Sequence, residues 1–338
     1  MQPFAPVEVY TTAPASVQVD GPAFRRRLTD VTRWTDAAGC TGLLVYSDNT
    51  LVDPWLVAQL ILDAAPRATP LVAVQPVYLS PYTAARMAAT LTFLHGRQVH
   101  LNLVTGGSRQ HLEALGDAGV GHDERYERLT EYATIVRLLL DSPRPVTFTG
   151  RYYQVLAATL PHRPPATLAP RLVLSGSSDS SVRCADELGI LRFAYPRPAD
   201  DYPADGPLLR GNGIRIGIIA RPDGDAAWRV AHDRFPGDPL GERRHRIVSR
   251  LSDSHWHAEL SGRPASDGIY WLHPFLTYRT FCPYLVGDYD EVGAYLARYL
   301  TRGVGSVILD VPEEEDDLHH ARIAFARAVA PVSAAPRE

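Results

Sequence analysis

The sequence predicts an α/β protein of the (β/α)8, or TIM-barrel, class, and three observations support this prediction. Short β-rich runs alternate with longer segments of helical periodicity, which is typical of parallel strands joined by crossover helices. The strand-like runs number eight, the number that closes such a barrel. With 338 residues, 45% of them hydrophobic, the chain is long enough to form one core of this size. We therefore expect one domain spanning residues 1–338.

The first strand and helix show the alternation most clearly. Residues 7–10 are strand-like, apolar residues then recur at helical spacing over 22–38, and Gly39 supplies a stop. The remaining strands are expected over 42–46, 70–77, 98–104, 172–175, 190–194, 214–220 and 306–310. Further helices are expected over 54–65, 82–94 and 122–140.

Two segments break this alternation. Residues 142–170 contain many prolines and the alternating run 146–153, which predicts an inserted hairpin. Residues 250–287 mix Gly, Pro, His and aromatic residues without a period. Insertions in a barrel usually cover the face at which the strands end, so both segments are candidate lids, with ordinary surface loops as the alternative.

The composition excludes several classes of function. A formal net charge of −4 leaves no basic stripe for phosphate contacts, so we expect no nucleic-acid partner. All 34 cationic side chains are arginine, and the chain has no lysine. This excludes mechanisms that need a lysine amine, such as a Schiff base or a P-loop.

The three cysteines and the N-terminal residues indicate the compartment. Cys40, Cys184 and Cys282 are widely spaced and form no CxxC or Cys/His cluster, so we expect reduced thiols and no metal site. The first residues lack a basic segment followed by an apolar run, and no stretch reaches the length of a membrane helix. We expect a cytoplasmic protein with a small-molecule substrate and no membrane partner.

The sharpest local motif follows the strand at 172–175. Gly176, Ser177 and Ser178 come directly after this strand, and a helix begins with Asp179 or a neighbouring residue as its cap. Backbone N–H groups at a helix start, together with two hydroxyls, suit a phosphate monoester. The alternative is a simple helix cap without a ligand.

A second motif lies at the end of the strand over 98–104. Strand alternation points Asn102 inward, and Thr105 is followed by Gly106 and Gly107, which let a ligand approach the backbone closely. A strand that ends in an ordinary glycine turn is the alternative.

The third motif opens the helix over 122–140. His122 and Tyr126 are four residues apart and therefore share one face of its first turn. A solvated surface histidine is the alternative to a ligand contact.

Together these motifs resemble the bacterial luciferase-like flavin monooxygenases, and most closely the alkanesulfonate monooxygenases. The resemblance extends from about residue 40 to 195 and is thinner afterwards. The segments that carry it, in the order of the family, are 71–76, 80–91, 102–107, 122–126 and 174–179.

The resemblance implies that the chain binds reduced FMN and uses it with O2 to oxygenate a small organic substrate through a C4a-peroxyflavin. The FMN phosphate would lie between the turn of Ser177 and Ser178 and the Tyr126 hydroxyl. A separate NAD(P)H-dependent flavin reductase would supply the reduced flavin, in agreement with the lack of a GxGxxG unit here. A homodimer or homotetramer is also implied. The side chains that would line the flavin ring and ribityl chain are Asp48, Gln75, Asn102, Thr105 and His122.

The departures from the family pattern lie on the substrate side. Leu51 stands where the alkanesulfonate enzymes carry a Cys, Gly217 stands in place of a His, and 309–313 replace a segment that offers Tyr and His. The pattern therefore predicts a substrate other than a simple alkanesulfonate, such as a biosynthetic intermediate. The Pro-rich connection 196–213 is too short for the crossover helix of the family, so one outer helix would be missing or shrunken.

Arg215 matches a catalytic arginine of the alkanesulfonate enzymes, and with His122 it is a candidate catalytic residue. Its fixed charge could hold an anionic substrate group or stabilise negative charge on the flavin peroxide. A salt bridge at a strand end is the alternative. The candidate substrate contacts are Leu51 and, in the second insertion, Arg263, His273, Tyr278 and Arg279.

Two other functions fit the same pattern. One is an oxidoreductase that moves hydride with the deazaflavin F420 and without oxygen, which needs extra room for the longer F420 tail. The other is a non-catalytic flavin-binding relative, favoured by the losses on the substrate side and opposed by the intact set of flavin residues.

Overall fold

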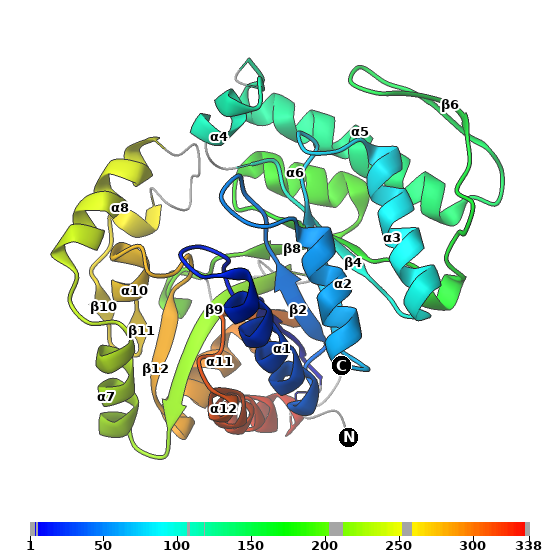
Figure 1. Cartoon of the computed structure of the whole chain (residues 1–338). Coiled ribbons are helices and arrows are strands. Elements are labelled where there is room, and N and C mark those ends of the chain that lie inside the picture. The colour runs from blue at the N-terminus through cyan, green and yellow to red at the C-terminus, as the bar shows by residue number, and fades with distance from the viewer. Residues whose placement is uncertain are drawn as a thin grey trace. The chain divides into compact units, whose positions relative to one another are not determined.

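The computed structural model describes residues 4, 6–106, 109–117, 119–202, 212–251 and 259–334 and has the expected (β/α)8 architecture (Figure 1). Its barrel strands are β1 (Glu8–Thr12), β2 (Gly42–Val45), β3 (Thr69–Val74), β4 (His100–Leu103), β7 (Leu172–Ser175), β8 (Leu191–Ala194), β9 (Asn212–Arg221) and β13 (Ser306–Leu309). They are hydrogen-bonded in the order β9-β13-β1-β2-β3-β4-β7-β8, and an additional pairing of β9 with β8 closes the circuit. The pairings of β1 with β13, β13 with β9, β3 with β4 and β4 with β7 are all parallel.

Helices follow most of these strands. They are α1 (Gly21–Ala37), α2 (Pro54–Ala64), α3 (Pro81–His95), α4 (Arg109–Ala114), α5 (His122–Asp141), α6 (Asp179–Leu188), α7 (Gly224–Arg234), α8 (Pro239–Leu251), α10 (His273–Leu276), α11 (Tyr289–Thr301) and α12 (Glu315–Ala334). No helix in the described ranges combines the length and the apolar character needed to cross a bilayer.

All eight predicted strands are confirmed, with bounds that shift by a few residues. The largest difference is at β3, which ends at Val74 instead of at residue 77. Pro76 has no backbone N–H for a strand ladder, and the Tyr78 N–H donates to the Gln75 carbonyl in a turn. Gln75 therefore lies just beyond the strand end.

Capping residues explain where two of the helices begin. Asp53 accepts hydrogen bonds from the Trp55 and Leu56 N–H groups at 2.9 and 3.1 Å, ahead of Pro54 at the first helical position of α2. Ser178, and not Asp179, is the cap of α6, because its Oγ accepts from the Ser181 N–H at 3.3 Å.

The contacts divide the chain into two compact units that alternate along the sequence. Unit 1 comprises Met1–Pro14, Asp30–Gly42 and Phe193–Glu338, and unit 2 comprises Ala15–Thr29 and Leu43–Arg192. The expectation of a single domain stays a prediction.

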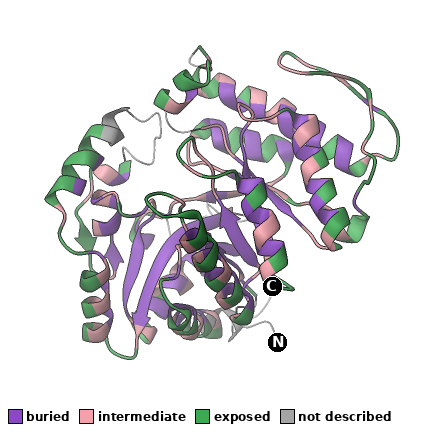
Figure 2. Cartoon of the chain, viewed as in Figure 1, coloured by how far each residue is buried: buried purple, intermediate pink, exposed green. Residues whose placement is uncertain are grey.

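Unit 1 has its core around β9 and a further strand, β12 (Tyr284–Asp288), which pairs with it in parallel. Both strands are buried along most of their length (Figure 2). Ile216 and Leu285 from the strands belong to one apolar cluster with Leu296 of α11 and Phe325 of α12, all of them fully buried. This packing holds the carboxyl end of β9 in a fixed place.

Unit 2 has its core between strands β3 and β4 and helices α3 and α5. Val72 and Leu101 from the strands pack in one cluster with Ala88 of α3 and Ile135 of α5, and all four are fully buried. The carboxyl ends of β3, β4 and β7 and the start of α5 therefore rest on a close-packed base.

The first insertion contains the expected hairpin. Strands β5 (Val146–Thr149) and β6 (Gln154–Ala158) pair antiparallel. Arg151 in the turn between them contacts Glu124 and Glu127 of α5 at 2.7 and 3.1 Å. These ion pairs fix the hairpin tip beside the N-terminal half of α5.

The second insertion has more regular structure than its composition indicates. It contains α10, the short strands β10 (Ser266–Asp267) and β11 (Tyr270–Trp271), and most of β12. The strand β12 was missed because four of its five residues are buried, so the run lacks the alternation of a half-exposed strand.

The connection from β8 to β9 lies partly outside the described residues. Its described part contains one 3-10 turn, Ala199–Asp201, and residues 203–211 are not described. The prediction of a missing outer helix is therefore not tested over the whole connection.

Candidate active site

Hydroxyl groups gather in unit 2 where β7 ends and α6 begins. Gly176 occupies the centre of this group, because a Cβ atom there would lie 2.7 Å from both the Tyr126 Oη and the Ser181 Cβ. Tyr126 forms side-chain hydrogen bonds with Ser178 and Thr105. We call Thr105, Tyr126, Gly176, Ser177 and Ser178 the hydroxyl cradle.

Ser177 gives the clearest sign that the hydroxyl cradle binds a ligand. Its Oγ is buried and has no hydrogen-bond partner among the described residues. A buried hydroxyl without a partner is unfavourable by about 1–3 kcal/mol, so a ligand that accepts a hydrogen bond from Ser177 would be stabilised. The N-terminus of α6 lies beside it and favours an anion, so the hydroxyl cradle fits a phosphate monoester.

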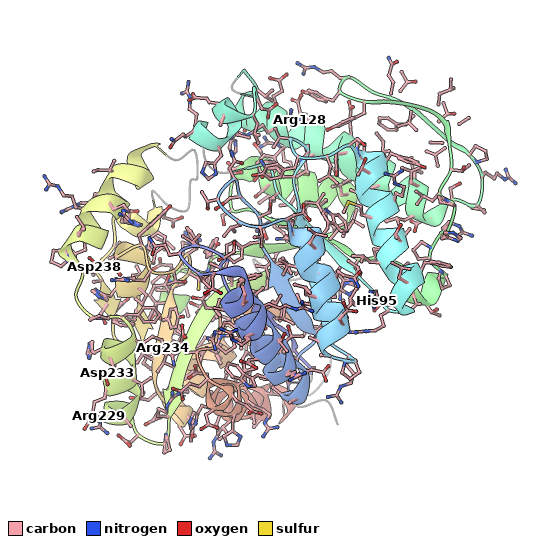
Figure 3. All side chains as sticks on the ribbon, viewed as in Figure 1. His95, Arg128, Arg229, Asp233, Arg234 and Asp238 are labelled. Atoms are coloured by element: carbon pink, nitrogen blue, oxygen red, sulfur yellow. The ribbon has the colours of Figure 1, made fainter. Side chains whose placement is uncertain are left out.

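Helix α5 brings Tyr126 and His122 to the same place. Their rings lie 5.2 Å apart, as the spacing of four residues predicted. Burial raises the pKa of Tyr126, and the hydrogen bonds with Ser178 and Thr105 oppose this change, so the phenol stays protonated and can donate. Arg128, two residues further along (Figure 3), holds the helix through a bidentate pair with Asp117 at 2.6 and 2.7 Å.

His122 is oriented by its neighbour Asp123. The His122 Nδ1 lies 2.8 Å from the Asp123 Oδ1, which also accepts a hydrogen bond from the Ser180 hydroxyl at 2.6 Å. The hydrogen bonds of Ser180 and His122 hold the pKa of Asp123 below its usual value. Asp123 is therefore a carboxylate that fixes the ring of His122 and links it to α6.

The ends of β3 and β4 place two buried amides near the hydroxyl cradle. The Ser175 hydroxyl donates to the Asn102 Oδ1 at 2.8 Å, so the other end of this amide is a donor suited to a carbonyl oxygen. The Gln75 side chain packs on Gly106, where a Cβ atom would lie 2.5 Å from the Gln75 Nε2. The absence of a side chain at Gly106 therefore makes room for Gln75.

Asp48 has a local structural role. Its Oδ1 accepts from the Thr50 N–H at 2.7 Å and from the Thr50 hydroxyl at 2.6 Å, which closes the turn after β2. Beside it, the Tyr78 hydroxyl donates to the Asn49 Oδ1 at 2.6 Å. A contact of Asp48 with a flavin stays a prediction, and so does a role for Leu51 in the same turn.

Unit 1 contains a separate polar cluster at the carboxyl end of the barrel strands. Arg215 of β9 is 9% exposed, donates to the Tyr195 hydroxyl at 3.3 Å and lies 3.6 Å from the Asp310 carboxylate just after β13. The alternative of a salt bridge at a strand end is therefore present. The catalytic role of Arg215 stays a prediction.

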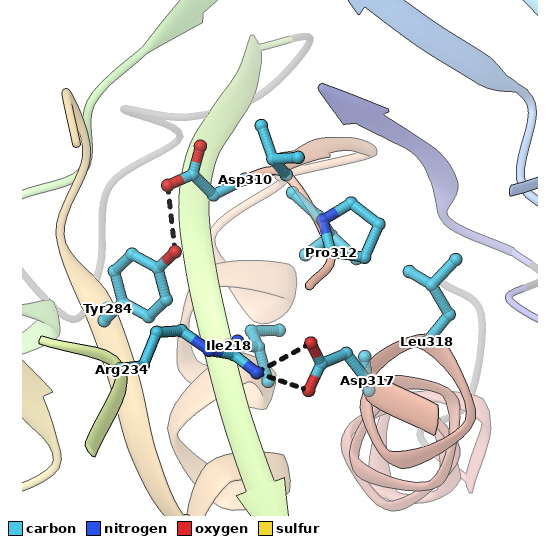
Figure 4. Close-up of a pocket in the computed structure, with 10 residues that line it drawn as sticks. Ile218, Arg234, Tyr284, Asp310, Pro312, Asp317 and Leu318 are labelled. Carbon is cyan, nitrogen blue, oxygen red and sulfur yellow. Dashed lines mark hydrogen bonds and ion pairs between the residues drawn. The ribbon is translucent and has the colours of Figure 1, made fainter. Parts of the chain in front are cut away.

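Asp310 accepts hydrogen bonds from several side chains. The Tyr284 hydroxyl donates to its Oδ2 at 2.9 Å (Figure 4), and the Thr280 hydroxyl donates to the same oxygen. Burial and the charge of Asp310 raise the pKa of Tyr284 well above its usual value, so this phenol remains a donor. Asp310 thus fixes both Arg215 and Tyr284.

A small pocket, partly open to solvent, adjoins this cluster (Figure 4). Tyr284 and Asp310 form one part of its lining, and Arg234 and Asp317 form another. The Asp317 carboxylate binds Arg234 at 2.9 Å and Arg221 at 3.0 Å. This buried ion triad ties the ends of β9 and α7 to the start of α12.

The structure of this cluster explains why residue 217 is a glycine. In the pairing of β12 with β9 it lies opposite Tyr284, and a methyl group at Gly217 would overlap the Tyr284 ring. The glycine allows the tyrosine to lie across the strand and to reach Asp310. Tyr284 therefore joins Gly217 and Asp310, two positions at which the sequence departs from the alkanesulfonate pattern.

A comparison with protein families decides the assignment. Residues 6–304 match the model of the family described as luciferase-like monooxygenase. The chain belongs to the luciferase-like monooxygenase family. It is accordingly a flavin-dependent enzyme that oxygenates its substrate, and the resemblance inferred from its motifs is confirmed.

Individual relatives agree with this membership. The chain is 33% identical over 312 residues to the 4-(γ-L-glutamylamino)butanoyl-[BtrI acyl-carrier protein] monooxygenase BtrO of Niallia circulans, covering 89% of this chain and 91% of that protein. Among solved structures, it resembles EDTA monooxygenase EmoA from Chelativorans sp. BNC1, with a TM-score of 0.74, 16% identity and coverage of 97% and 93%. It also resembles the oxygenating constituent of 3,6-diketocamphane monooxygenase of Pseudomonas putida in complex with FMN, with a TM-score of 0.68, 16% identity and coverage of 98% and 100%.

The candidate substrate residues of the second insertion have contacts within unit 1. Arg263 forms an ion pair with Asp201, and Arg279 pairs with Asp238 at 2.8 Å. His273 stacks on Trp271, and Tyr278 packs against Phe281. Contact of these four with substrate stays a prediction of this luciferase-like monooxygenase.

The sequence motifs missed several residues of both clusters. Ser175 and Ser181 flank the predicted phosphate motif, and Tyr195 follows β8 directly. Polar residues just after barrel strands are typical functional positions, so Tyr195 could have been found by that rule. Thr280 and Tyr284 carried no such signal, because β12 itself was not recognised.

The overlap at Gly217 makes a testable prediction. We expect Gly217→Ala to destabilise the enzyme by about 1–3 kcal/mol, because the new methyl group must displace the Tyr284 ring. In a Tyr284→Ala background the same substitution should cost much less, which a double-mutant cycle in urea denaturation would measure. Additive effects of the two substitutions would show that the ring and the glycine are not coupled.

Proposed function

We propose that this chain is the oxygenase component of a two-component system. It binds reduced FMN supplied by a separate NAD(P)H-dependent flavin reductase and oxygenates an acyl group that an acyl-carrier protein carries as a thioester. The observation that carries the cofactor assignment is the hydroxyl cradle with its buried Ser177 Oγ, which fits the phosphate of FMN.

The candidate site residues of unit 2 each have a task toward this cofactor. The hydroxyl cradle binds the phosphate through Ser177, Ser178 and Tyr126, and the positive end of α6 favours its charge. The buried amides of Asn102 and Gln75 supply donors for the ring carbonyl oxygens. His122, held by Asp123, is a group that can donate or accept a proton beside them.

The overall reaction balances without a further reactant. Reduced FMN, when bound, supplies two electrons. One oxygen atom of O2 then enters the substrate and the other leaves as water. Arg215 contributes a fixed positive charge in unit 1, and Asp310 holds its guanidinium in place.

Two observations support the substrate class. The relative BtrO, by its name, acts on an acyl group attached to an acyl-carrier protein, and this chain aligns with almost all of it. The positions that depart from the alkanesulfonate pattern, Gly217 and Asp310, are here joined in one structural cluster through Tyr284. This arrangement supports a substrate other than a simple alkanesulfonate.

Titration of the purified chain with reduced flavins tests the cofactor assignment. We expect reduced FMN to bind, and O2 uptake to follow when oxygenated buffer is added. We expect Ser177→Ala to weaken FMN binding about tenfold, a loss of about 1.4 kcal/mol, because it removes one hydrogen bond to a charged group. The affinity for reduced riboflavin, which has no phosphate, should stay unchanged.

Ser142→Ala is the matched control, since Ser142 lies at the far end of α5 from Tyr126. It should leave the affinities for both flavins unchanged. Preferred binding of reduced F420 without O2 uptake would replace the proposal by hydride transfer, and absence of binding of any flavin would contradict both.

A further inference from the structure

Helix α8 presents an exposed surface that combines arginine with large apolar side chains. Leu240 is 70% exposed and Ile247 is 56% exposed, and Arg243 and Arg244 between them are also exposed. Residues three, four and seven apart share one face of a helix. We call Leu240, Arg243, Arg244 and Ile247 the α8 face.

The opposite side of α8 already packs on the protein. The His245 ring lies 4.6 Å from the Phe275 ring of α10, and its Nε2 is 2.8 Å from the Ser261 hydroxyl. Gly241 is buried against the backbone carbonyl of Thr277. The core of unit 1 therefore explains the buried side of α8 and leaves the apolar residues of the α8 face without a structural role.

The segment under α8 leads to the polar cluster of Arg215. Residues 277–280 follow α10, and the Thr280 hydroxyl donates to Asp310, which pairs with Arg215. Asp238, just before α8 (Figure 3), pairs with Arg279 of the same segment at 2.8 Å. All these contacts lie within unit 1, so residues 277–280 connect α8 to the polar cluster.

The charge of the α8 face selects an acidic partner. Among the described side chains of the helix, Arg243, Arg244 and Arg246 are exposed together with one acidic residue, Glu242. The chain as a whole has a net charge of −4, so the positive charge of this surface differs from the charge of the whole chain. Arginine is enriched at protein-binding surfaces, and exposed apolar side chains beside it are a feature of interaction sites.

We propose that the α8 face docks the acyl-carrier protein that delivers the substrate. This inference rests on the proposed function. Acyl-carrier proteins are small and acidic, so their surface complements Arg243 and Arg244, while Leu240 and Ile247 supply the apolar centre of the interface. The α8 face is connected to Arg215 through residues 277–280 and Asp310. A carrier protein docked on this face would direct its acyl group toward Arg215.

A binding measurement with the BtrI acyl-carrier protein, loaded with the 4-(γ-L-glutamylamino)butanoyl group, tests the proposal. We expect the double variant Arg243→Glu/Arg244→Glu to bind it at least about tenfold more weakly, with most of the loss in the association rate. The matched control is Arg25→Glu/Arg26→Glu, an adjacent pair of exposed arginines on α1, which should bind like the wild type. Added salt should weaken wild-type binding more than that of the α8 variant.

A second variant, Leu240→Gln/Ile247→Gln, tests the apolar part and should also weaken binding. Binding of the carrier by the α8 charge variant as tightly as by the wild type, or no binding by the wild type at all, overturns the docking proposal. Oxygenation of the acyl group is recorded separately. A carrier that binds through the α8 face but is not oxygenated supports the docking proposal and contradicts the proposed substrate.

Discussion

A Gly176→Ala enzyme will lose most of its affinity for reduced FMN. The new Cβ atom would lie 2.7 Å from the Tyr126 Oη and from the Ser181 Cβ, closer than atoms can approach. The Tyr126 hydroxyl must therefore move out of the hydroxyl cradle, and a shift of Ser181 also displaces Ser178, to which Ser181 is hydrogen-bonded. Loss of the charge-assisted hydrogen bonds of Tyr126 and Ser178 to the phosphate, each worth about 1.5–3 kcal/mol, weakens binding by about 100-fold or more.

Riboflavin separates this effect from a general disturbance of the site. It lacks the phosphate, so its affinity should change little in Gly176→Ala, and the preference of the enzyme for FMN over riboflavin should disappear. Isothermal titration of both reduced flavins measures the two affinities. Gly21→Ala is the control, because a Cβ atom at Gly21 would meet no atom within 4 Å. An unchanged preference for FMN would show that the phosphate binds elsewhere.

The barrel was predictable because its signals are local. Apolar strands such as Leu172–Ser175 are followed by residues that favour turns, and the helices have apolar stripes and caps such as Ser178. The strand β12 was not predictable in this way. It is short and buried, and its pairings with the extended β9 and with β11 make it a strand.

The same distinction applies to the site. The residues of the hydroxyl cradle lie in motifs that a single stretch of sequence can show, and the structure brings Thr105, Tyr126 and Ser178 together. The polar cluster of unit 1 depends on register between distant strands. In the sequence, Gly217 is only the absence of the family's His, and its role becomes clear from Tyr284, which lies opposite it on β12. No local pattern in the sequence reports such a pairing.

The largest loss of stability is expected from Asp317→Asn. The Asp317 side chain is 6% exposed and lies between Arg221 and Arg234, each 13% exposed. Its Oδ2 also accepts from the backbone N–H groups of Glu313 and Glu314, so it fixes the start of α12. Removal of its charge leaves two buried guanidinium groups unpaired, which costs about 3–5 kcal/mol.

Urea denaturation of Asp317→Asn measures this loss. Asp316→Asn is the matched control, since Asp316 is the exposed neighbour of Asp317 and the same substitution there should change stability by less than about 0.5 kcal/mol. Equal stabilities of the two variants would show that the triad contributes no more than a surface charge.

The pH dependence of this difference tests the cause. Burial by itself would raise the pKa of Asp317, but the charges and hydrogen bonds of Arg234 and Arg221 outweigh burial and hold it below its usual value. A carboxyl whose pKa is lowered by folding stabilises the protein above its unfolded pKa, about 3.9, and loses this contribution as the pH falls through the folded pKa. The stability difference between the wild type and Asp317→Asn should therefore be full at neutral pH and shrink below about pH 4. A difference that stays constant down to pH values at which the carboxylate is protonated would assign the loss to packing instead of charge.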